Sequence, residues 1–77
     1  MTAKALKRAL AEQLRESMLE QNITKVAMAA RMETSRSQVD RLLDPDNLNI
    51  QFDSLMRAAT AVGKRVEIRL VDERIAA

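Results

Sequence analysis

The apolar residues of this chain follow helical spacing as far as Gly63 and alternate with a period of two after it. Residues three or four apart share one face of a helix, whereas residues two apart share one face of a strand. The chain has 77 residues, which suffices for one small domain with a modest core. The pattern therefore predicts a mainly α-helical single domain over residues 1–77, with four to five helices and one C-terminal β-strand.

The helical part divides into segments with defined start and stop signals. Thr24, Ser35 and Asp53 each stand before an apolar-periodic run, and their side-chain oxygens can accept a hydrogen bond from an unpaired helix amide. Ser35 and Gln38 also fit a capping box. Gly63 can take the left-handed conformation that commonly follows a helix. The expected helices span about residues 2–21, 25–32, 36–43 and 54–62.

The residue types that the chain lacks exclude several kinds of catalytic and metal-binding site. Phe52 is the one aromatic residue, so the core must be aliphatic, and no cysteine or histidine is present. Thiol nucleophiles, disulfides, imidazole bases and the usual zinc or haem ligands are therefore excluded. No apolar run approaches the ~20 residues that span a bilayer. We expect a non-enzymatic, cytoplasmic protein with no cofactor, no metal and no contact with the membrane.

The alternating segment, residues 64–72, is a strand without a visible mate. A lone strand leaves backbone donors and acceptors unpaired, and no other segment of the chain offers to pair with it. Antiparallel pairing of two copies about Ile68 is self-complementary, as a two-fold interface requires. It opposes Glu67 to the partner's Arg69, Val66 to Leu70 and Lys64 to Asp72, and leaves only Arg65 with Val71 unmatched.

We therefore predict a homodimer formed through this strand. The dimerisation residues are Val66, Glu67, Ile68, Arg69 and Leu70. Two alternatives remain open: the strand packs on its own helices, or it extends the sheet of a different protein, which would make the chain a non-DNA-binding adaptor.

Two short helices joined at Glu33-Thr34-Ser35 form a helix-turn-helix pattern. Ala29, small and in the middle of the first helix, allows the second to cross closely. Ordinary helix packing explains the same pattern, so the pattern alone does not show that the two helices bind DNA. The 13 Lys and Arg residues exceed the 11 Asp and Glu residues, with the excess in the N-terminal half, and this weakly favours a polyanionic partner.

The stretch "TKVAMAARMETSRSQVDRLL" (residues 24–43) resembles the Xre, or lambda-repressor-like, helix-turn-helix family. Residues 58–70, which cover the end of the predicted fourth helix and the segment after it, look like the C-terminal end of short Xre regulators and of HigA-type antitoxins. Two positions depart from the family pattern: Lys25 replaces a glutamine, and Glu33 replaces the glycine of the turn. The matching residues are Thr24, Met28, Ala29, Met32, Thr34, Ser35, Val39, Arg41 and Leu42.

The resemblance implies that the third helix enters the major groove of double-stranded DNA. The base contacts would then be Arg36, Ser37, Asp40 and Arg41. Either arginine can read guanine or hold a phosphate instead. The backbone contacts would be Thr24, Lys25, Ser35, Asn47 and Asn49. Lys4, Lys7 and Arg8 in the first helix are weaker candidates for phosphate contact.

The function expected from these observations is that of a sequence-specific DNA-binding transcriptional regulator. It would act as a repressor and bind a palindromic operator as a homodimer. An alternative is the antitoxin of a toxin–antitoxin module, which would repress its own promoter and also bind a toxin protein. The adaptor remains the alternative from a different class.

Overall fold

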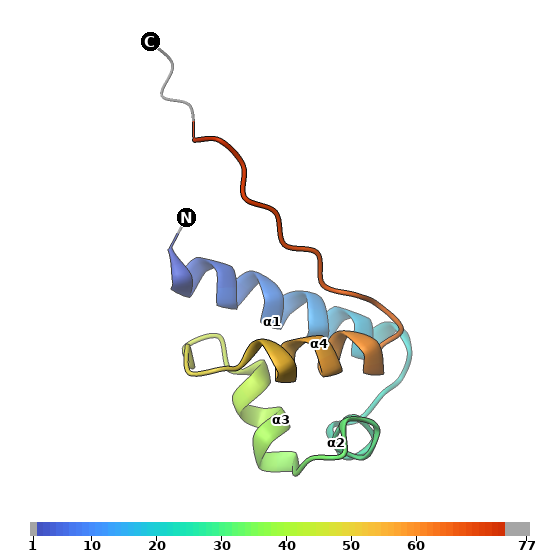
Figure 1. Ribbon diagram of the computed structural model, residues 1–77. Helices are drawn as coiled ribbons and strands as arrows, with labels where there is room; N and C mark the ends of the chain where they lie inside the picture. Colours follow the sequence, from blue (N-terminus) through green and yellow to red (C-terminus); the bar gives the residue numbers. More distant parts are fainter. Residues whose placement is uncertain (1, 74–77) are drawn as a thin grey trace.

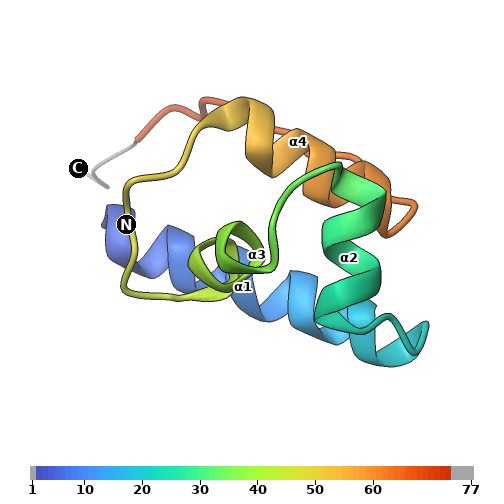
Figure 2. The ribbon, with the colours of Figure 1, turned by 90° about the horizontal axis from the view of Figure 1, so that it is seen from below.

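The computed structural model describes residues 2–73 and shows a mainly helical fold (Figure 1). The predicted helical class is confirmed, and within that part of the chain the helices number four. Helices α2 and α3 lie on one side of α1 and α4, and residues 64–73 leave from the opposite side (Figures 1 and 2). The helices are α1 (Ala3–Glu20), α2 (Lys25–Met32), α3 (Arg36–Leu43) and α4 (Phe52–Ala61).

Hydroxyl side chains begin the first three helices. Oγ1 of Thr2 accepts from the amide of Ala5 at 3.0 Å, and the N-caps predicted at Thr24 and Ser35 are confirmed. The Ser35 Oγ accepts from the amide of Gln38 at 3.2 Å. The reciprocal bond from the Gln38 side chain is absent among residues 2–73, so the capping box is half formed. These caps hold the two short helices to the predicted boundaries.

Helix α4 begins earlier than predicted. Gln51 is its N-cap and forms no side-chain cap bond, so the prediction that Asp53 caps this helix is wrong. Asp53 lies in the first turn instead, where its Oδ2 is 3.3 Å from Nε of Arg57, one helical turn further on. A carboxylate in the first turn also interacts favourably with the helix dipole.

The core is aliphatic, as the composition requires. Met28, Val39 and Ala58 are fully buried, and Leu42 and Leu43 pack beside them. Val39, Leu42 and Leu43 therefore form the inward face of α3. On α4, Leu55, Ala58 and Ala59 are buried, whereas Met56 is 60% exposed. Within residues 2–73, no helix has both the length and the apolar character needed to cross a bilayer.

Three helices end in the same left-handed turn. Asn22 and Glu33 both have φ of 55°, and Gly63 has φ of 73°. After each, the next amide bonds to a carbonyl five residues back, at 2.8, 2.9 and 2.8 Å respectively. This is the Schellman pattern. At Glu33 the chain thus adopts a positive φ without a glycine.

The left-handed conformation at Glu33 gives a direct stability prediction. A non-glycine residue in this region is strained by about 1–2 kcal/mol. We expect Glu33→Gly to raise the free energy of unfolding by about 1 kcal/mol, net of the extra freedom of glycine in the unfolded chain. The melting temperature should rise by about 4–8 °C in a thermal denaturation experiment. Glu33→Ala keeps the strain and serves as the control; an equal gain in both variants would contradict this explanation.

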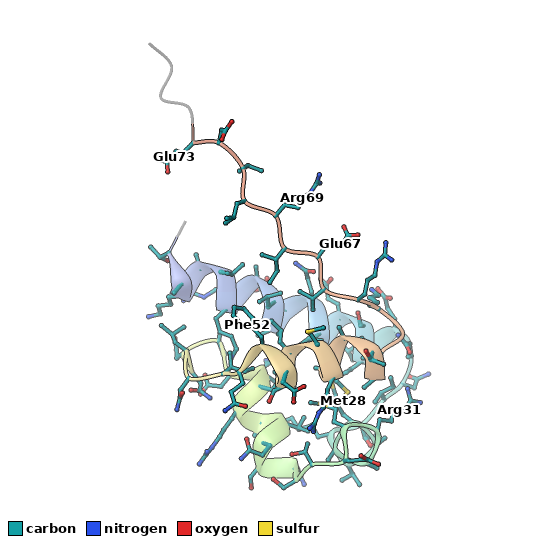
Figure 3. The ribbon with its side chains drawn as sticks, viewed as in Figure 1. Met28, Arg31, Phe52, Glu67, Arg69 and Glu73 are labelled. Carbon is teal, nitrogen blue, oxygen red and sulfur yellow. The ribbon has the colours of Figure 1, made fainter. Side chains whose placement is uncertain are left out.

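Residues 64–73 are extended but form no strand, which corrects the predicted C-terminal β-strand for the single chain. The reason is physical: a strand is defined by hydrogen bonds to a neighbour, and the described remainder of the chain is helices and their connections. Val66 is half-buried against the core, Ile68 is largely exposed, and Leu70 is 100% exposed. Glu67 and Arg69 project from this segment away from the helices (Figure 3). We call residues 64–73 the tail.

Candidate nucleic-acid interface

Helix α3 has one buried and one open side. Val39, Leu42 and Leu43 face the core. The four predicted base-contact residues, Arg36, Ser37, Asp40 and Arg41, are all exposed on the side that the core leaves free. We call this open side the α3 face. Thr34 and Ser35 lie in the short turn that joins α2 to α3 (Figure 1).

Two of the predicted DNA-contacting residues bind each other. Nζ of Lys25, at the start of α2, lies 2.8 Å from Oδ1 of Asp40 on α3, and both side chains are about half exposed. The hydrogen bond from Lys25 lowers the pKa of Asp40, and the nearby charges of Lys25 and Arg36 lower it further. Asp40 is thereby held as a carboxylate. This pair places an acceptor-only group on the α3 face with its charge balanced by a lysine.

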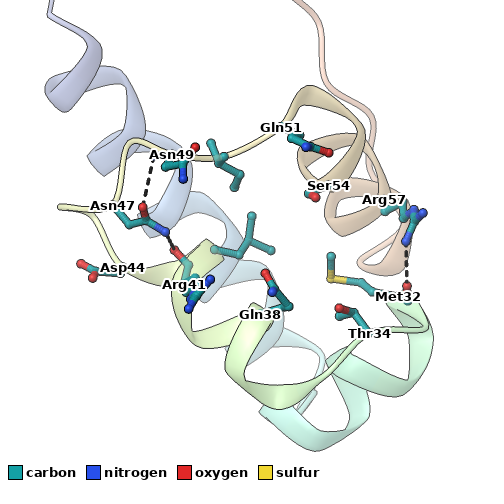
Figure 4. A pocket seen from close by; sticks show the side chains of 12 residues that line it. Met32, Thr34, Gln38, Arg41, Asp44, Asn47, Asn49, Gln51, Ser54 and Arg57 are labelled. Atoms are coloured by element: carbon teal, nitrogen blue, oxygen red, sulfur yellow. Dashed lines mark hydrogen bonds between the residues drawn. The ribbon is translucent and has the colours of Figure 1, made fainter.

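A polar groove of about 720 Å³ runs beside α3 (Figure 4). Its walls come from the end of α2 and the turn after it, from α3, from the 44–51 loop and from the first turns of α4. Arg41 from α3 and Arg57 from α4 both line it. Arg57 is not recognisable as a groove residue from the sequence, where its one signal is the spacing of four from Asp53. The other lining residues are Met32, Thr34, Gln38, Leu42, Asp44, Asn47, Asn49, Ile50, Gln51 and Ser54.

Asn47 and Asn49, the two loop residues predicted to contact the DNA backbone, differ in how free their side chains are to bind a ligand. The Asn47 side chain donates to the Arg41 carbonyl at 3.2 Å, and its oxygen accepts from the Asn49 amide at 3.1 Å. Asn47 therefore holds the loop against the end of α3, and a phosphate would compete with these bonds. The Asn49 side chain is exposed and borders the groove (Figure 4). It is the better placed of the two to meet a ligand.

The remaining predicted backbone contacts, Thr24 and Ser35, are exposed at the N-termini of α2 and α3. Each hydroxyl oxygen is occupied as a cap acceptor. A hydroxyl keeps its own hydrogen as a donor, so a cap residue can still donate to a phosphate oxygen. Capping and phosphate contact are therefore compatible at both positions.

Lys7 is not a surface phosphate contact, so that weaker candidate is wrong. Its side chain is 4% exposed, and Nζ donates to the carbonyls of Arg41, Asp44 and Asn47 at 3.3, 2.7 and 2.8 Å. Burial lowers the pKa of Lys7, and the Asp44 carboxylate partly opposes this shift. Arg15, also on α1, donates to the Leu43 carbonyl at 2.9 Å. Two cations of α1 thus fix the C-terminal end of α3.

This fixation predicts a large effect at Lys7. Lys7→Met keeps most of the length of the side chain but removes a charged hydrogen-bond donor from the carbonyls of Arg41, Asp44 and Asn47. We expect the free energy of unfolding to fall by about 2 kcal/mol or more in urea denaturation. The matched control is Lys4→Met, because Lys4 is exposed and lies 3.6 Å from Asp46. That change should cost less than about 1 kcal/mol. Equal losses in the two variants would show that the three bonds of Lys7 do not stabilise the fold.

The α3 face and the groove together offer positive charges, amide donors and hydroxyls, with the carboxylates of Asp40 and Asp44 among them. In the part of the chain that the structure describes, no group of three or more His, Cys, Asp or Glu residues could hold a metal ion. Comparison with family models, with curated proteins and with solved structures finds no match for this chain.

Proposed function

We propose that this protein is a sequence-specific DNA-binding transcriptional regulator that represses by placing α3 in the major groove. The observation that carries the proposal is the division of α3, which buries Val39 and Leu42 and exposes Arg36 and Arg41. A helix that served only the core would have no need of two exposed arginines flanking a paired carboxylate. The resemblance of residues 24–43 to the Xre family supports the same assignment.

Base readout would come from the α3 face. A guanidinium can donate two hydrogen bonds to O6 and N7 of guanine, and a carboxylate can accept from N4 of cytosine. Arg36 and Arg41 therefore suit guanine, and Asp40 suits cytosine. Each bidentate arginine contact discriminates against a wrong base by about 1–3 kcal/mol. Lys25 offsets the repulsion between Asp40 and the DNA phosphates.

Phosphate contacts would surround this readout. Thr24 and Lys25 stand at the start of α2, and Ser35 stands at the start of α3. On the other side of the reading helix, Asn49 and Arg57 border the groove. Contacts of this kind fix the position of the protein on the duplex and make its affinity fall with salt.

The regulator would bind DNA as a homodimer. One protomer offers a single reading helix, and the unpaired tail can form a two-stranded antiparallel sheet with the tail of a second copy. A two-fold dimer reads a palindrome, with half-sites about 34–36 Å apart, one helical turn. An antitoxin that represses its own promoter would use the same α3 face, so the predictions for Arg36 and Arg41 hold for it too.

The exposed tail also favours a second candidate, an adaptor that extends the sheet edge of a different protein. Its backbone is free for such pairing, and Leu70 offers an apolar anchor. An adaptor would make no use of Arg36 and Arg41. The two candidates therefore differ in what DNA does to α3.

Titration of the ¹⁵N-labelled protein with a mixed-sequence duplex at low salt tests the proposal. Non-specific binding by such domains has a Kd of about 10⁻⁴–10⁻⁶ M at physiological salt, within reach of NMR. We expect amide shifts at the start of α3, at Lys25 and at Asn49, with Glu12 and Glu16 on the outer side of α1 unmoved. Shifts confined to α1 or the tail, or none at low salt, would contradict DNA binding through α3.

A further inference from the structure

The side of the molecule opposite the α3 face carries several exposed apolar side chains. Phe52 and Met56 project from α4, and Ile68 and Leu70 project from the tail, all of them more than half exposed. Between α4 and the tail lies a hollow of about 220 Å³ that is lined by residues with apolar side chains: Phe52, Leu55, Met56, Val66 and Ile68. Met56 borders this hollow and is not part of the buried core.

We propose that this hollow receives Leu70 from the tail of a second copy of the chain. The inference deepens the homodimer of the proposed function and rests on it. Strand pairing alone would join the tails and leave Phe52 and Met56 in water. The added claim is that the interface is a composite of tail and α4, in which each protomer completes the other's hollow.

The pairing register brings the two parts together. Antiparallel pairing about Ile68 sets the partner's Leu70 directly opposite Val66. Directly opposed residues have Cβ atoms about 4.5–5.5 Å apart. Because Val66 lines the hollow, the partner's Leu70 arrives at its edge. The two-fold axis repeats the contact, so both copies of Leu70, each 100% exposed in the single chain, lose their contact with water.

The charges favour a second copy over a foreign strand. Arg65 Nη2 lies 3.1 Å from Oε1 of Glu67 within one chain. In the two-fold register, Glu67 also faces the partner's Arg69, so the carboxylate lies between two guanidinium groups. Two pairs of residues equidistant from Ile68, Glu67 with Arg69 and Lys64 with Asp72, carry opposite charges, which is the self-complementarity that an isologous interface needs. An unrelated strand would match this order only by coincidence.

The position of the hollow suits DNA binding. The tail leaves the helices on the side away from α2 and α3 (Figure 1). Pairing through tail and α4 therefore leaves the α3 face of each protomer uncovered. The interface would join two reading helices without using either of them.

Sedimentation equilibrium of the full chain, over a wide range of protein concentration, tests the inference. Leu70→Asp removes the inserted side chain, and Met56→Asp places a charge in the receiving hollow. Both residues are exposed in the protomer, so circular dichroism should show unchanged helix content. Each change should raise the dimer dissociation constant by at least about 30-fold, as expected for a central interface residue. Leu19→Asp, at another exposed leucine on α1, is the matched control and should leave the dimer intact.

The outcomes separate the claims. Weakening by Leu70→Asp and Met56→Asp, but not by Leu19→Asp, supports the composite interface. A dimer that tolerates both changes overturns it, even if charge changes in the tail show that the tails still pair. A wild-type protein that stays monomeric, or that associates only with a different protein, also overturns it. None of these results depends on DNA. They therefore do not test DNA binding by α3, which the duplex titration tests separately.

Discussion

Replacing Arg36 and Arg41 together by alanine is expected to abolish sequence-selective DNA binding without unfolding the protein. Both side chains are exposed, and neither forms a side-chain hydrogen bond among residues 2–73, so the core and the caps do not depend on them. If both contacts are bidentate, their loss removes about 2–6 kcal/mol of discrimination at each half-site. A residual, salt-sensitive affinity for any duplex should remain.

The measurement is fluorescence anisotropy with a duplex enriched from a random pool, compared with a scrambled duplex. The control is Lys4→Ala with Arg8→Ala, which removes the same charge from the exposed part of α1. The control should keep its preference for the enriched duplex. If both double variants lose the same affinity, only net charge matters. If the Arg36 and Arg41 variant binds as the wild type does, α3 does not read the bases.

Reversing one charge in the tail should weaken the homodimer, and mixing two variants with complementary reversals should restore a dimer. Glu67→Arg alone, or Arg69→Glu alone, opposes like charges at two places across the two-fold axis. Each cross-strand charge pair contributes about 0.2–1 kcal/mol, so losing two attractions and gaining two repulsions should weaken either homodimer by about 1–4 kcal/mol. In a mixture of the two variants, every opposed pair has opposite charges again, and a heterodimer should form.

Sedimentation velocity at low ionic strength, where surface charges are least screened, measures this exchange. Labelling one variant identifies the mixed species. Recovery of a dimer only in the mixture would support antiparallel pairing about Ile68, because few other arrangements couple these two positions reciprocally. Homodimers that tolerate both single changes would exclude the register, as would a mixture that stays monomeric.

The helical frame could be predicted from the sequence because its determinants are local. Apolar spacing and the hydroxyls of Thr24 and Ser35 act within one or two turns, and the predicted bounds of α2 and α3 are confirmed. The predicted start of α4 was wrong for an equally local reason. Asp53 can cap a helix or stabilise its first turn, and the sequence alone does not choose between the two.

The tail shows a different limit. Alternation predicts which side of an extended segment is apolar, and Val66 does pack toward the core. A strand, however, is a relation between two segments, and the described part of the single chain contains only one. The pattern was therefore informative about the tail's conformation and its apolar side, while its partner stays a prediction.

The site depended most on contacts between residues far apart in the sequence. The Lys7 Nζ donates to carbonyls of residues 34, 37 and 40 positions further along the chain, and no rule of sequence spacing predicts such a contact. The pairing of Lys25 with Asp40 depends on how α2 crosses α3, and the position of Arg57 in the groove depends on where α4 begins. The exposed residues of α3 could be predicted because they follow from which residues are buried.

Selection of bound duplexes from a random pool by the wild-type protein tests the central claim most directly, that two copies of α3 read one palindrome. We predict enrichment of an inverted repeat whose half-site centres lie about 34–36 Å apart, one turn of DNA. Failure to enrich any sequence, or enrichment of a single motif without an inverted repeat, would contradict it.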